Sequence, residues 1–479
     1  MFDLATAAVE GALAAGAAYA DARVVVTTTE WLHARNGVLE GLSQAESAGV
    51  GVRALLGSSW GFSATAELTG AAARGAGEDA MAVARASARV PGPPLELADV
   101  PVREDHWQSV WREHPADVSL AEKGDLLLTA TDTMTAVAGV SVGEAALASW
   151  DTEKWFVSSQ GHRISQHIVE CGASMSATAV GESESQRRSY GGIGGHFGTR
   201  GFELVRDADL GANAGRVGEE AVALLAAPLC PQGVTDLILG PEQLGLQIHE
   251  SVGHAIELDR ILGWEAAFAG TSFLDLAALG SLRYGSELMN VTADATIPGA
   301  LGTFGYDDEG TPAGRVDIVR DGVWVGVLSG RDSAAVTGLP PGGMVRADGW
   351  ARLPMVRMTN VGILPGDSSL DEIVAATADG VYMETNRSWS IDDKRLNFQF
   401  GCEVGREVKD GRLGRLVRNP TYTGITPRFW GSLDMLGGRN EWVSWGTPNC
   451  GKGQPQQLGH TGHPAVPARF RGVRVGVRG

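Results

Sequence analysis

The sequence predicts an α+β protein: N-terminal mixed α/β segments with antiparallel hairpins, followed by a β-rich C-terminal domain that carries the helix of a candidate active site. Three observations lead to this class. The chain has 479 residues, too many for one ordinary hydrophobic core. Its 66 glycines are about twice the usual share, which indicates many turns and tight hairpins. Helical periodicity alternates with strand patterns in the first half, whereas strand and turn patterns dominate the second.

Two proline-containing stretches divide the chain into three predicted units. Residues 91–94 read Pro-Gly-Pro-Pro, and residues 228–233 contain two prolines and end in glycine. Proline ends helices and glycine permits turns, so both stretches are predicted linkers. The predicted units are an N-terminal α+β segment (1–90), a middle α+β segment (102–227) and a β-rich C-terminal domain (234–479).

The first unit is predicted to combine helices with hairpins. Residues 1–20 alternate alanine-rich apolar positions with Asp3 and Glu10, as an amphipathic helix does. Asn36-Gly37 lies between two strand patterns and favours a two-residue hairpin turn. The expected strands cover 21–29, 31–35, 38–42, 49–56 and 60–64, and an alanine-rich helix covers 68–89.

The second unit continues the alternation of helix and strand. Ser119 and Glu122 have the spacing of a capping box, which predicts a helix running to about residue 138. Strands are expected over 140–150, 154–158 and 163–180, and a helix over 210–227. The run 191–196 is rich in glycine but lacks the G-x-G-x-x-G spacing of a phosphate loop, so a flexible loop is expected there.

The third unit is expected to consist mainly of hairpins. Asp321-Gly322 and Asp410-Gly411 are typical two-residue turns between strands. One short capped helix is expected over 369–377. A helix near the start of this unit carries the most informative motif in the chain.

Composition and charge exclude several classes of protein. The net charge of −18 and the pI near 5.0 argue against a nucleic-acid-binding or membrane-binding surface. The one basic cluster, residues 469–478, is expected to be a solvated tail. No apolar run approaches the length of a membrane span, and Asp3 and Glu10 stand where a signal peptide has basic residues. Four cysteines are too few for a disulfide framework, so we expect a reduced, cytoplasmic protein.

The candidate metal motif is His249-Glu250-Ser251-Val252-Gly253-His254. Neutral imidazoles bind zinc, and a glutamate beside one of them can take a proton from a metal-bound water. The two histidines are five residues apart, about 140° around a regular helix, so they reach one ion only if the helix widens or ends between them. A π-turn, with Gly253 as a tolerant position, would align them. A regular α-helix would exclude the site.

Several residues could supply the third ligand that a catalytic zinc site needs. Glu257 and Asp259 lie about one turn after the motif, and His460 and His463 lie near the C-terminus. Cys450 lies in Asn-Cys-Gly-Lys-Gly-Gln, a sequence typical of a loop, where Lys452 would favour the thiolate.

Taken with other segments, these residues resemble the TldD/PmbA family of metallopeptidases. The resembling segments are Gly49-Val-Gly-Val-Arg53, Trp60-Gly-Phe62, Arg357-Met-Thr-Asn360, Leu364-Pro-Gly366 and Phe398–Gly401, so the match runs from about residue 20 to about 456. The resemblance implies that His249, His254 and Cys450 bind one Zn²⁺ per catalytic subunit, with Glu250 as general base. This chain keeps every element and therefore resembles the catalytic type.

The resemblance also implies a substrate and a partner. Members act on peptides or unfolded segments, so the expected function is hydrolysis of peptide bonds. A dimer is expected, either with a homologous subunit that lacks the motif or with a second copy of this chain. Three residues are candidate oxyanion stabilisers: Tyr422, Arg357 and His460.

Two other functions stay open at this point. One is a zinc amidohydrolase acting on a small amide, because a His₂Cys site also suits such chemistry. The other is a non-enzymatic modulator or binding subunit with a structural metal, which a fourth protein ligand such as His460 or His463 would close.

Overall fold

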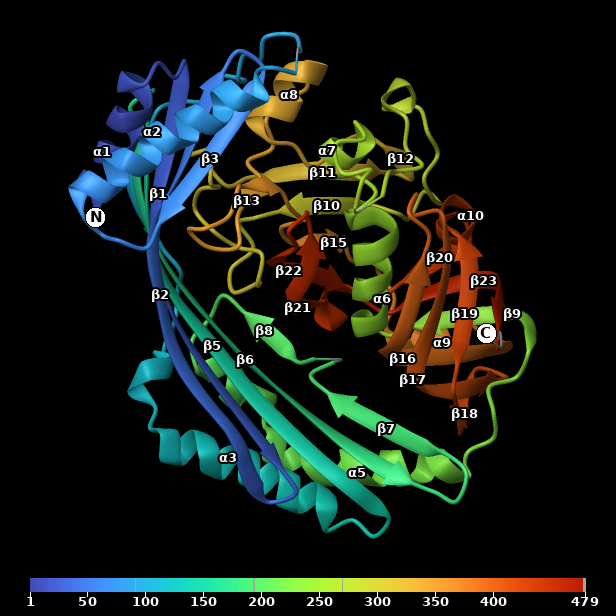
Figure 1. The fold of residues 1–479 in the computed structure, drawn as a ribbon. Helices are drawn as coiled ribbons and strands as arrows, with labels where there is room; N and C mark the ends of the chain where they lie inside the picture. The colour runs from blue at the N-terminus through green and yellow to red at the C-terminus, as the bar shows by residue number, and fades with distance from the viewer. Residues whose placement is uncertain (91, 193, 269, 477–479) are drawn as a thin grey trace.

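The first two units of the chain are built on one continuous eight-stranded sheet (Figure 1). The structure is a computed structural model that describes residues 1–90, 92–192, 194–268 and 270–476. The strand order is β3-β2-β1-β5-β6-β4, and β7 and β8 also pair with β6. The strands are β1 (Tyr19–Arg35), β2 (Val38–Leu56), β3 (Ser59–Thr65), β4 (Glu104–Gln108), β5 (Val140–Ser158), β6 (Arg163–Val180), β7 (Ser185–Tyr190) and β8 (His196–Gly198). Because β1 pairs with β2 on one edge and β5 on the other, the two units share their central strands.

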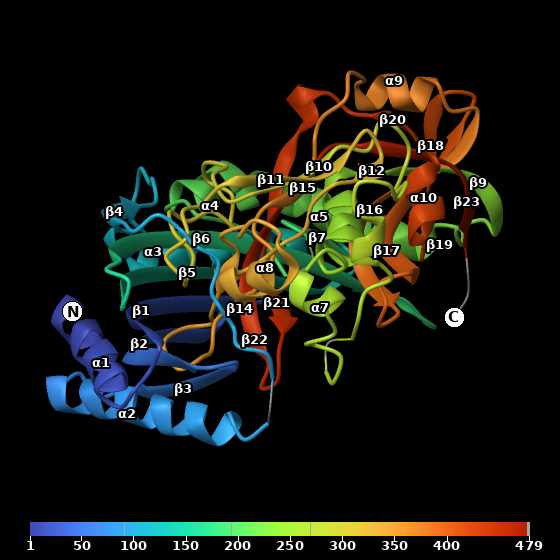
Figure 2. The ribbon, with the colours of Figure 1, turned by 90° about the horizontal axis from the view of Figure 1, so that it is seen from above.

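Two pairs of helices cover the two ends of this long sheet (Figures 1 and 2). α1 (Phe2–Ala14) and α2 (Gly70–Ser87) pack at the end that carries β3, and α3 (Leu120–Thr135) and α5 (Leu210–Ala226) at the other. The alanines and glycines of α1 and α2 let these helices approach closely: a Cβ on Gly77 would lie 2.1 Å from the Ala8 carbonyl oxygen. The short α4 (Glu203–Ala208) precedes α5.

The third unit contains a seven-stranded sheet, a four-stranded sheet and two hairpins. The seven-stranded sheet has the order β16-β9-β23-β19-β17-β18, with β20 paired to β23. Its strands are β9 (Gly233–Leu239), β16 (Asp379–Ile391), β17 (Asn397–Lys409), β18 (Arg412–Arg418), β19 (Thr421–Ile425), β20 (Leu433–Leu436) and β23 (Ala468–Val475). The four-stranded sheet joins β12 (Val323–Trp324), β11 (Arg315–Arg320), β10 (Val291–Asp294) and β15 (Val361–Ile363). The hairpins are β13 (Val345–Arg346) with β14 (Met355–Val356) and β21 (Val443–Lys452) with β22 (Gln457–Ala465).

One helix, α6 (Pro241–Ile248), lies at the centre of the third unit (Figure 1). It packs against β16 on one side and the β21–β22 hairpin on another, and Leu244 and Ile248 are fully buried in the main core. The other helices are α7 (Leu258–Ile261), α8 (Arg331–Thr337), α9 (Leu370–Ala375) and α10 (Thr426–Gly431). A helix surrounded in this way presents its side chains to a protected interior.

The predicted α+β class and the predicted turns are confirmed. Asn36-Gly37, Asp321-Gly322 and Asp410-Gly411 all have positive φ at both residues, as the tight hairpin turn requires. The Ser119 side chain accepts a hydrogen bond from the Glu122 backbone N–H, and Ser369 forms a complete capping box with Glu372.

Two sets of expectations need correction. The strands expected separately over 21–29 and 31–35, over 38–42 and 49–56, and over 140–150 and 154–158 form single long strands, β1, β2 and β5, because the neighbouring strands pair with them across each expected break. The basic cluster expected to be a solvated tail contains β23, in which Arg469 is buried and paired with Asp434. The first linker and the glycine run each include one residue, Pro91 and Ile193, that lies outside the described part of the chain.

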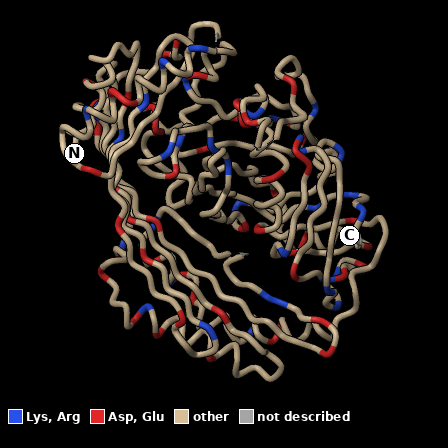
Figure 3. The backbone as a smooth tube through the Cα atoms, in the orientation of Figure 1, with Lys and Arg blue, Asp and Glu red and all other residues tan. Residues whose placement is uncertain are grey.

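The charged residues are dispersed over the fold. Figure 3 shows Lys and Arg interspersed with Asp and Glu along both the long sheet and the third unit. In the described residues, no helix is both long and apolar enough to span a bilayer. All four cysteines, Cys171, Cys230, Cys402 and Cys450, are buried and unpaired by disulfides.

Candidate metal centre

The two motif histidines are brought together by a widened turn at the end of α6. The helix continues into a π-helical turn, His249–Gly253, and the His254 N–H donates to the His249 carbonyl oxygen at 3.1 Å. This i→i+5 bond aligns residues five apart. The two imidazole centroids are 4.8 Å apart and the rings are nearly perpendicular. The predicted widening of the helix is therefore confirmed.

Cys450 reaches the same point from the β21–β22 hairpin. Its Sγ lies 3.6 Å from Nε2 of His254, and one ligand atom from each of His249, His254 and Cys450 lies within 4.8 Å of the other two. All three side chains are buried. The expectation of a loop was wrong: Cys450 lies in strand β21, beside a register shift in its pairing with β22.

Hydrogen bonds fix which nitrogen of His249 is free. Nδ1 of His463 faces the Val361 carbonyl oxygen at 3.1 Å, and a carbonyl only accepts, so this nitrogen carries the proton. Nε2 of His463 is then an acceptor, and Nδ1–H of His249 donates to it at 2.7 Å. Burial, with His249 nearby, holds the pKa of His463 well below its usual value, which keeps this ring neutral. Nε2 of His249 is left with a free lone pair.

Glu257 determines which nitrogen of His254 is free. Nδ1–H of His254 donates to Oε2 of Glu257 at 3.0 Å, which leaves Nε2 of His254 facing Cys450. Burial acts to raise the pKa of Glu257, but Lys452 and His254 outweigh it and hold the pKa well below its usual value. Histidine ligands in metal sites are usually oriented by such outer hydrogen bonds.

The remaining candidate ligands lie elsewhere. Asp259 accepts from Lys452 at 2.8 Å, so Lys452 forms a buried ion pair instead of acting on the thiol as expected. Burial acts to raise the pKa of Cys450, but His254 and Arg357 outweigh it and lower the pKa of the thiol. His460 pairs with Glu170 at 2.8 Å, in a second cavity of about 310 Å³ next to the long sheet.

Glu250, the candidate general base, is paired with an arginine that the sequence did not indicate. Nη1 of Arg395 donates to Oε2 of Glu250 at 2.7 Å, and both side chains are largely buried. Nε and Nη2 of Arg395 have no hydrogen-bond partner in the described part of the chain. Arg395 lies in the turn between β16 and β17 with a φ of +64°, which is uncommon outside glycine and is often found at functional sites.

The three sequence candidates for an oxyanion stabiliser do not line the cavity beside the metal cluster. Tyr422 lies beneath α6, where its hydroxyl binds Gln243 and Gln247. Arg357 holds the hairpin through the carbonyl oxygens of Cys450 and Gln457. Arg395 comes from a turn with no recognisable motif, and only the tertiary fold brings it to Glu250.

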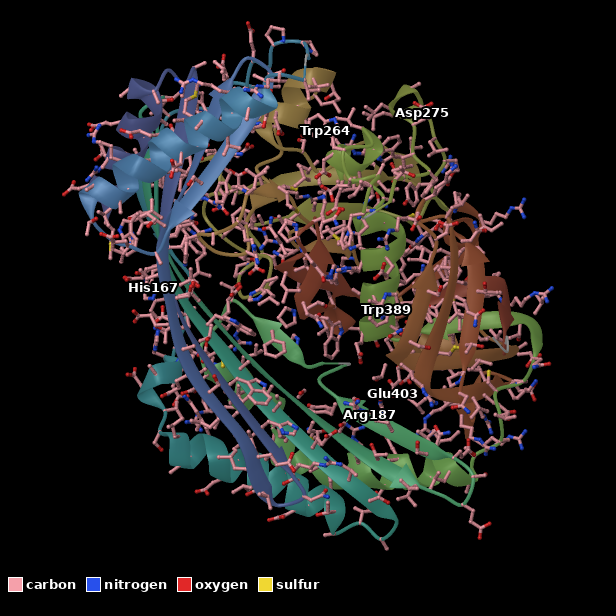
Figure 4. All side chains as sticks on the ribbon, viewed as in Figure 1. His167, Arg187, Trp264, Asp275, Trp389 and Glu403 are labelled. Carbon is pink, nitrogen blue, oxygen red and sulfur yellow. The ribbon has the colours of Figure 1, made fainter. Side chains whose placement is uncertain are left out.

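A cavity of about 460 Å³ opens on the metal cluster. Its walls include the described glycines of 191–195, the cavity-facing residues of α6, the aromatic rings of Trp389 and Trp445, and Arg395. The glycine run is thus part of the wall of the candidate site, a placement that its spacing did not predict. Figure 4 labels Trp389, a residue of β16, where the β16–β17 hairpin lies next to α6.

Three family models match the chain in consecutive segments. They describe the PmbA/TldA metallopeptidase domain 1 (20–86), the central domain (113–228) and the C-terminal domain (232–473). Together they include His249, His254, Cys450 and most of the fold.

Named relatives and solved structures agree with these matches. A metalloprotease of Methanocaldococcus jannaschii is 30% identical over 85% of this chain and 86% of the relative, and one of Methanothermobacter thermautotrophicus is 30% identical over 96% and 95%. A zinc metalloprotease TldD homolog of Saccharolobus solfataricus is 27% identical over 43% of this chain and 44% of the relative. The fold matches TldE of Thermococcus kodakarensis (TM-score 0.71, 14% identity, 98% of each chain) and a Thermotoga maritima protein described as a modulator of a DNA gyrase (TM-score 0.78, 16% identity, 99% of each chain). The chain belongs to the PmbA/TldA (TldD/PmbA) metallopeptidase family.

Proposed function

We propose that this chain is a zinc metallopeptidase that hydrolyses peptide bonds in peptides or unfolded segments. The observation that carries the proposal is the convergence of His249 Nε2, His254 Nε2 and Cys450 Sγ beside Glu250. Two imidazoles and a thiolate suit zinc better than a hard cation. Both histidines have their other nitrogen engaged, so the donor set fits one Zn²⁺ per subunit.

The arrangement favours a catalytic site over a structural one. A structural zinc is closed by four protein ligands. Among the described residues three ligand atoms come together, since His463 is engaged by His249 and Val361 and His460 by Glu170. A cavity of about 460 Å³ lies over the cluster, with room for a short stretch of peptide. This is the main argument against the modulator alternative.

The proposed mechanism assigns roles to the bound zinc, to Glu250 and to Arg395. Zinc, when bound, polarises the scissile carbonyl and lowers the pKa of water toward about 7. Glu250 accepts the proton of the attacking water and passes it to the leaving amine. Arg395 donates a hydrogen bond to the carbonyl oxygen as negative charge develops there, through a guanidinium nitrogen that has no other partner among the described residues.

We further propose a cytoplasmic protein that works as a dimer, with a homologous motif-lacking subunit or with a second copy of itself. Four buried, unbridged cysteines are consistent with a reducing compartment. Size-exclusion chromatography of the chain alone, and then with a candidate partner, distinguishes the two kinds of dimer.

Metal content and peptide hydrolysis, measured together, test the proposal. The parent chain and Glu250→Gln should each hold one equivalent of zinc by elemental analysis, because Glu250 is not a ligand. Cys450→Ala should lose that zinc. Only the parent should hydrolyse an unfolded peptide, since Glu250→Gln lacks the base and Cys450→Ala the metal.

Two results would contradict the proposal. Turnover retained in Glu250→Gln would remove the general base, and unchanged zinc in Cys450→Ala would remove the third ligand. A series of peptides of increasing length, compared with a small amide, separates a peptidase from an amidohydrolase. The peptidase should prefer the longer substrates.

A further inference from the structure

The cavity over the metal cluster has an acidic end that the proposed mechanism does not use. Glu242 lies seven residues before His249 on α6, and residues seven apart share one face of a helix. At 1.5 Å per residue this places Glu242 about 10 Å along the helix from the metal ligand. Both residues line the same cavity.

One oxygen of the Glu242 carboxylate accepts a hydrogen bond, and the other is available to a ligand. Oε2 accepts from the Thr385 hydroxyl at 3.0 Å, whereas Oε1 has no hydrogen-bond partner in the described part of the chain. Thr385 has a φ of +57°, a genuine outlier for a β-branched residue. Such strain persists only where the surrounding structure imposes it, and it concentrates at functional sites.

Asn386 adds a second unused acceptor next to Glu242. Its side chain is 1% exposed and lines the cavity. Nδ2 faces three oxygens, those of the Gln243 side chain and of the Ser388 and Gly401 carbonyls, at 3.3–3.4 Å, so the amide orientation is fixed by its donors. Oδ1 has no hydrogen-bond partner among the described residues. A buried amide oxygen in the wall of a cavity is available to accept an N–H from a ligand.

In the described part of the chain Glu242 forms no ion pair with a Lys or Arg side chain, although the charge of Arg188 opposes the rise of its pKa. The nearby guanidinium of Arg188 is engaged by Glu220 and Glu384, each at 2.7 Å. Glu403 is a further acid beside it, at 3.8 Å from Arg188. Burial, and then the charge of Glu403, raise the pKa of Glu242 to about 7. The cluster therefore has more carboxylates than cations.

An aromatic ring also lines this cavity. Trp389 follows Thr385 and Asn386 on β16, is 50% exposed and lines the cavity. Figure 4 shows Glu403 on the side of the third unit that faces β7 and Trp389 closer to α6. The face of an indole attracts cations and packs on alkyl chains.

We infer that Glu242, Asn386 and Trp389 form a subsite for a positively charged nitrogen group of the peptide. The carboxylate and the amide oxygen accept its N–H donors, and the indole covers it. The inference rests on the proposed peptidase function and adds its substrate preference. The group is either the ammonium of the peptide N-terminus or the side chain of Lys or Arg. If it is the N-terminus, a distance of about 10 Å corresponds to about three extended residues before the cleaved bond.

A matched set of peptides tests the subsite. One parent sequence is made with Lys or norleucine at each of the three positions before the cleaved bond, and each peptide has a free or an acetylated N-terminus. For the wild-type chain, kcat/KM should fall about 10–100-fold when the recognised charge is removed. Loss on acetylation identifies the N-terminus, and loss on the Lys-to-norleucine change identifies a side chain. No loss in either series would overturn the inference.

Variants assign the preference to Glu242. Glu242→Gln keeps the shape of the side chain and should abolish the 10–100-fold preference, so that the charged and uncharged peptides are hydrolysed with equal kcat/KM. Glu407→Gln is the matched control. Glu407 lies near the end of β17 and pairs with Arg415 of β18, so its loss should leave the preference unchanged. A preference retained in Glu242→Gln would overturn the inference.

Binding separates this inference from the proposed function. The charged and uncharged peptides are titrated by calorimetry into Glu250→Gln and into Glu250→Gln/Glu242→Gln. Tighter binding of the charged peptide that requires Glu242 supports the subsite even if the wild-type chain hydrolyses no peptide, in which case the peptidase proposal alone fails. Equal binding of the two peptides, together with hydrolysis by the wild-type chain, removes the subsite and leaves the peptidase proposal in place.

Discussion

The imidazoles of the candidate metal cluster are oriented by two hydrogen-bond acceptors, one distant in sequence and one close to its histidine. His463, on β22, accepts a hydrogen bond from Nδ1–H of His249, and Glu257, three residues after His254, accepts one from Nδ1–H of His254. With those protons placed, each Nε2 is available to a metal before any metal arrives. Outer hydrogen bonds of this kind typically affect metal affinity 10–100-fold. The site is therefore determined by five side chains, of which three are the proposed ligands.

Arg395 gives the clearest prediction for a single residue. Arg395→Gln should lower kcat about 10²–10³-fold with little change in KM, because the proposed hydrogen bond to the developing oxyanion would be made only in the transition state. Zinc content should be unchanged, since Arg395 contacts Glu250 and not a ligand. Steady-state kinetics and elemental analysis measure both quantities.

Lys394→Ala is the matched control for Arg395→Gln. It removes a cation one residue away in the same turn and should leave kcat unaffected. Millimolar guanidinium added to Arg395→Ala should partly restore turnover, which would not happen if Arg395 only supported the fold. An equal loss in the Lys394 and Arg395 variants would contradict the prediction.

The π-turn is the element on which the site depends, and Gly253 allows it to pack. A Cβ added at Gly253 would lie 2.0 Å from Sδ of Met358, which is itself fully buried. Gly253→Ala should therefore shift the turn or the methionine, lower the thermal midpoint and weaken zinc binding. Differential scanning calorimetry and a competitive zinc titration measure the two effects.

Gly215→Ala controls for the loss of a glycine from a helix. Gly215 lies inside α5, and a Cβ there would meet no atom within 4 Å. Alanine is favoured over glycine in a helix by about 0.5–1 kcal/mol, so this variant should be more stable with unchanged zinc binding. A Gly253→Ala chain that behaved like Gly215→Ala would show that the turn tolerates a side chain.

Local sequence signals predicted the elements well where they were short-range. The hairpins at Asn36-Gly37 and at the two Asp-Gly turns, and the helix that follows Ser119, were predicted because the interactions that form them are between neighbouring residues. The five-residue spacing of His249 and His254 predicted the π-turn for the same reason. Arg395, Glu242 and His463 could not be assigned, because their partners lie 143 to 214 residues away in sequence and only tertiary packing makes the contacts.

At the scale of the whole molecule, buried ion pairs connect the long sheet to the third unit. Asp308 accepts from Arg23 of β1 at 2.9 Å and from Lys154 of β5 at 2.7 Å. Arg53 of β2 similarly reaches Glu309 at 3.2 Å. One short segment of the third unit therefore binds three adjacent strands of the sheet. These ion pairs fix the position of the third unit relative to the long sheet.

Asp308→Asn should destabilise the chain by about 3–5 kcal/mol at neutral pH, because it leaves Arg23 and Lys154 buried without their counter-charge. Burial acts to raise the pKa of Asp308, but Lys154 and Arg23 outweigh it and hold the pKa far below its usual value. A depressed carboxyl pKa contributes stability above the unfolded-state value, about 4, and that contribution is lost as the pH falls below it. The difference between wild type and Asp308→Asn should thus be constant from about pH 6 to 8. Below about pH 4 it should shrink by up to about 1.4 kcal/mol per pH unit.

Urea unfolding at a series of pH values measures this difference. The control is Asp379→Asn, whose carboxylate forms an exposed pair with Lys409 and which should show neither the loss of stability nor its pH dependence. A difference that stayed constant down to pH 3 would show that the Asp308 charge does not hold the two halves together.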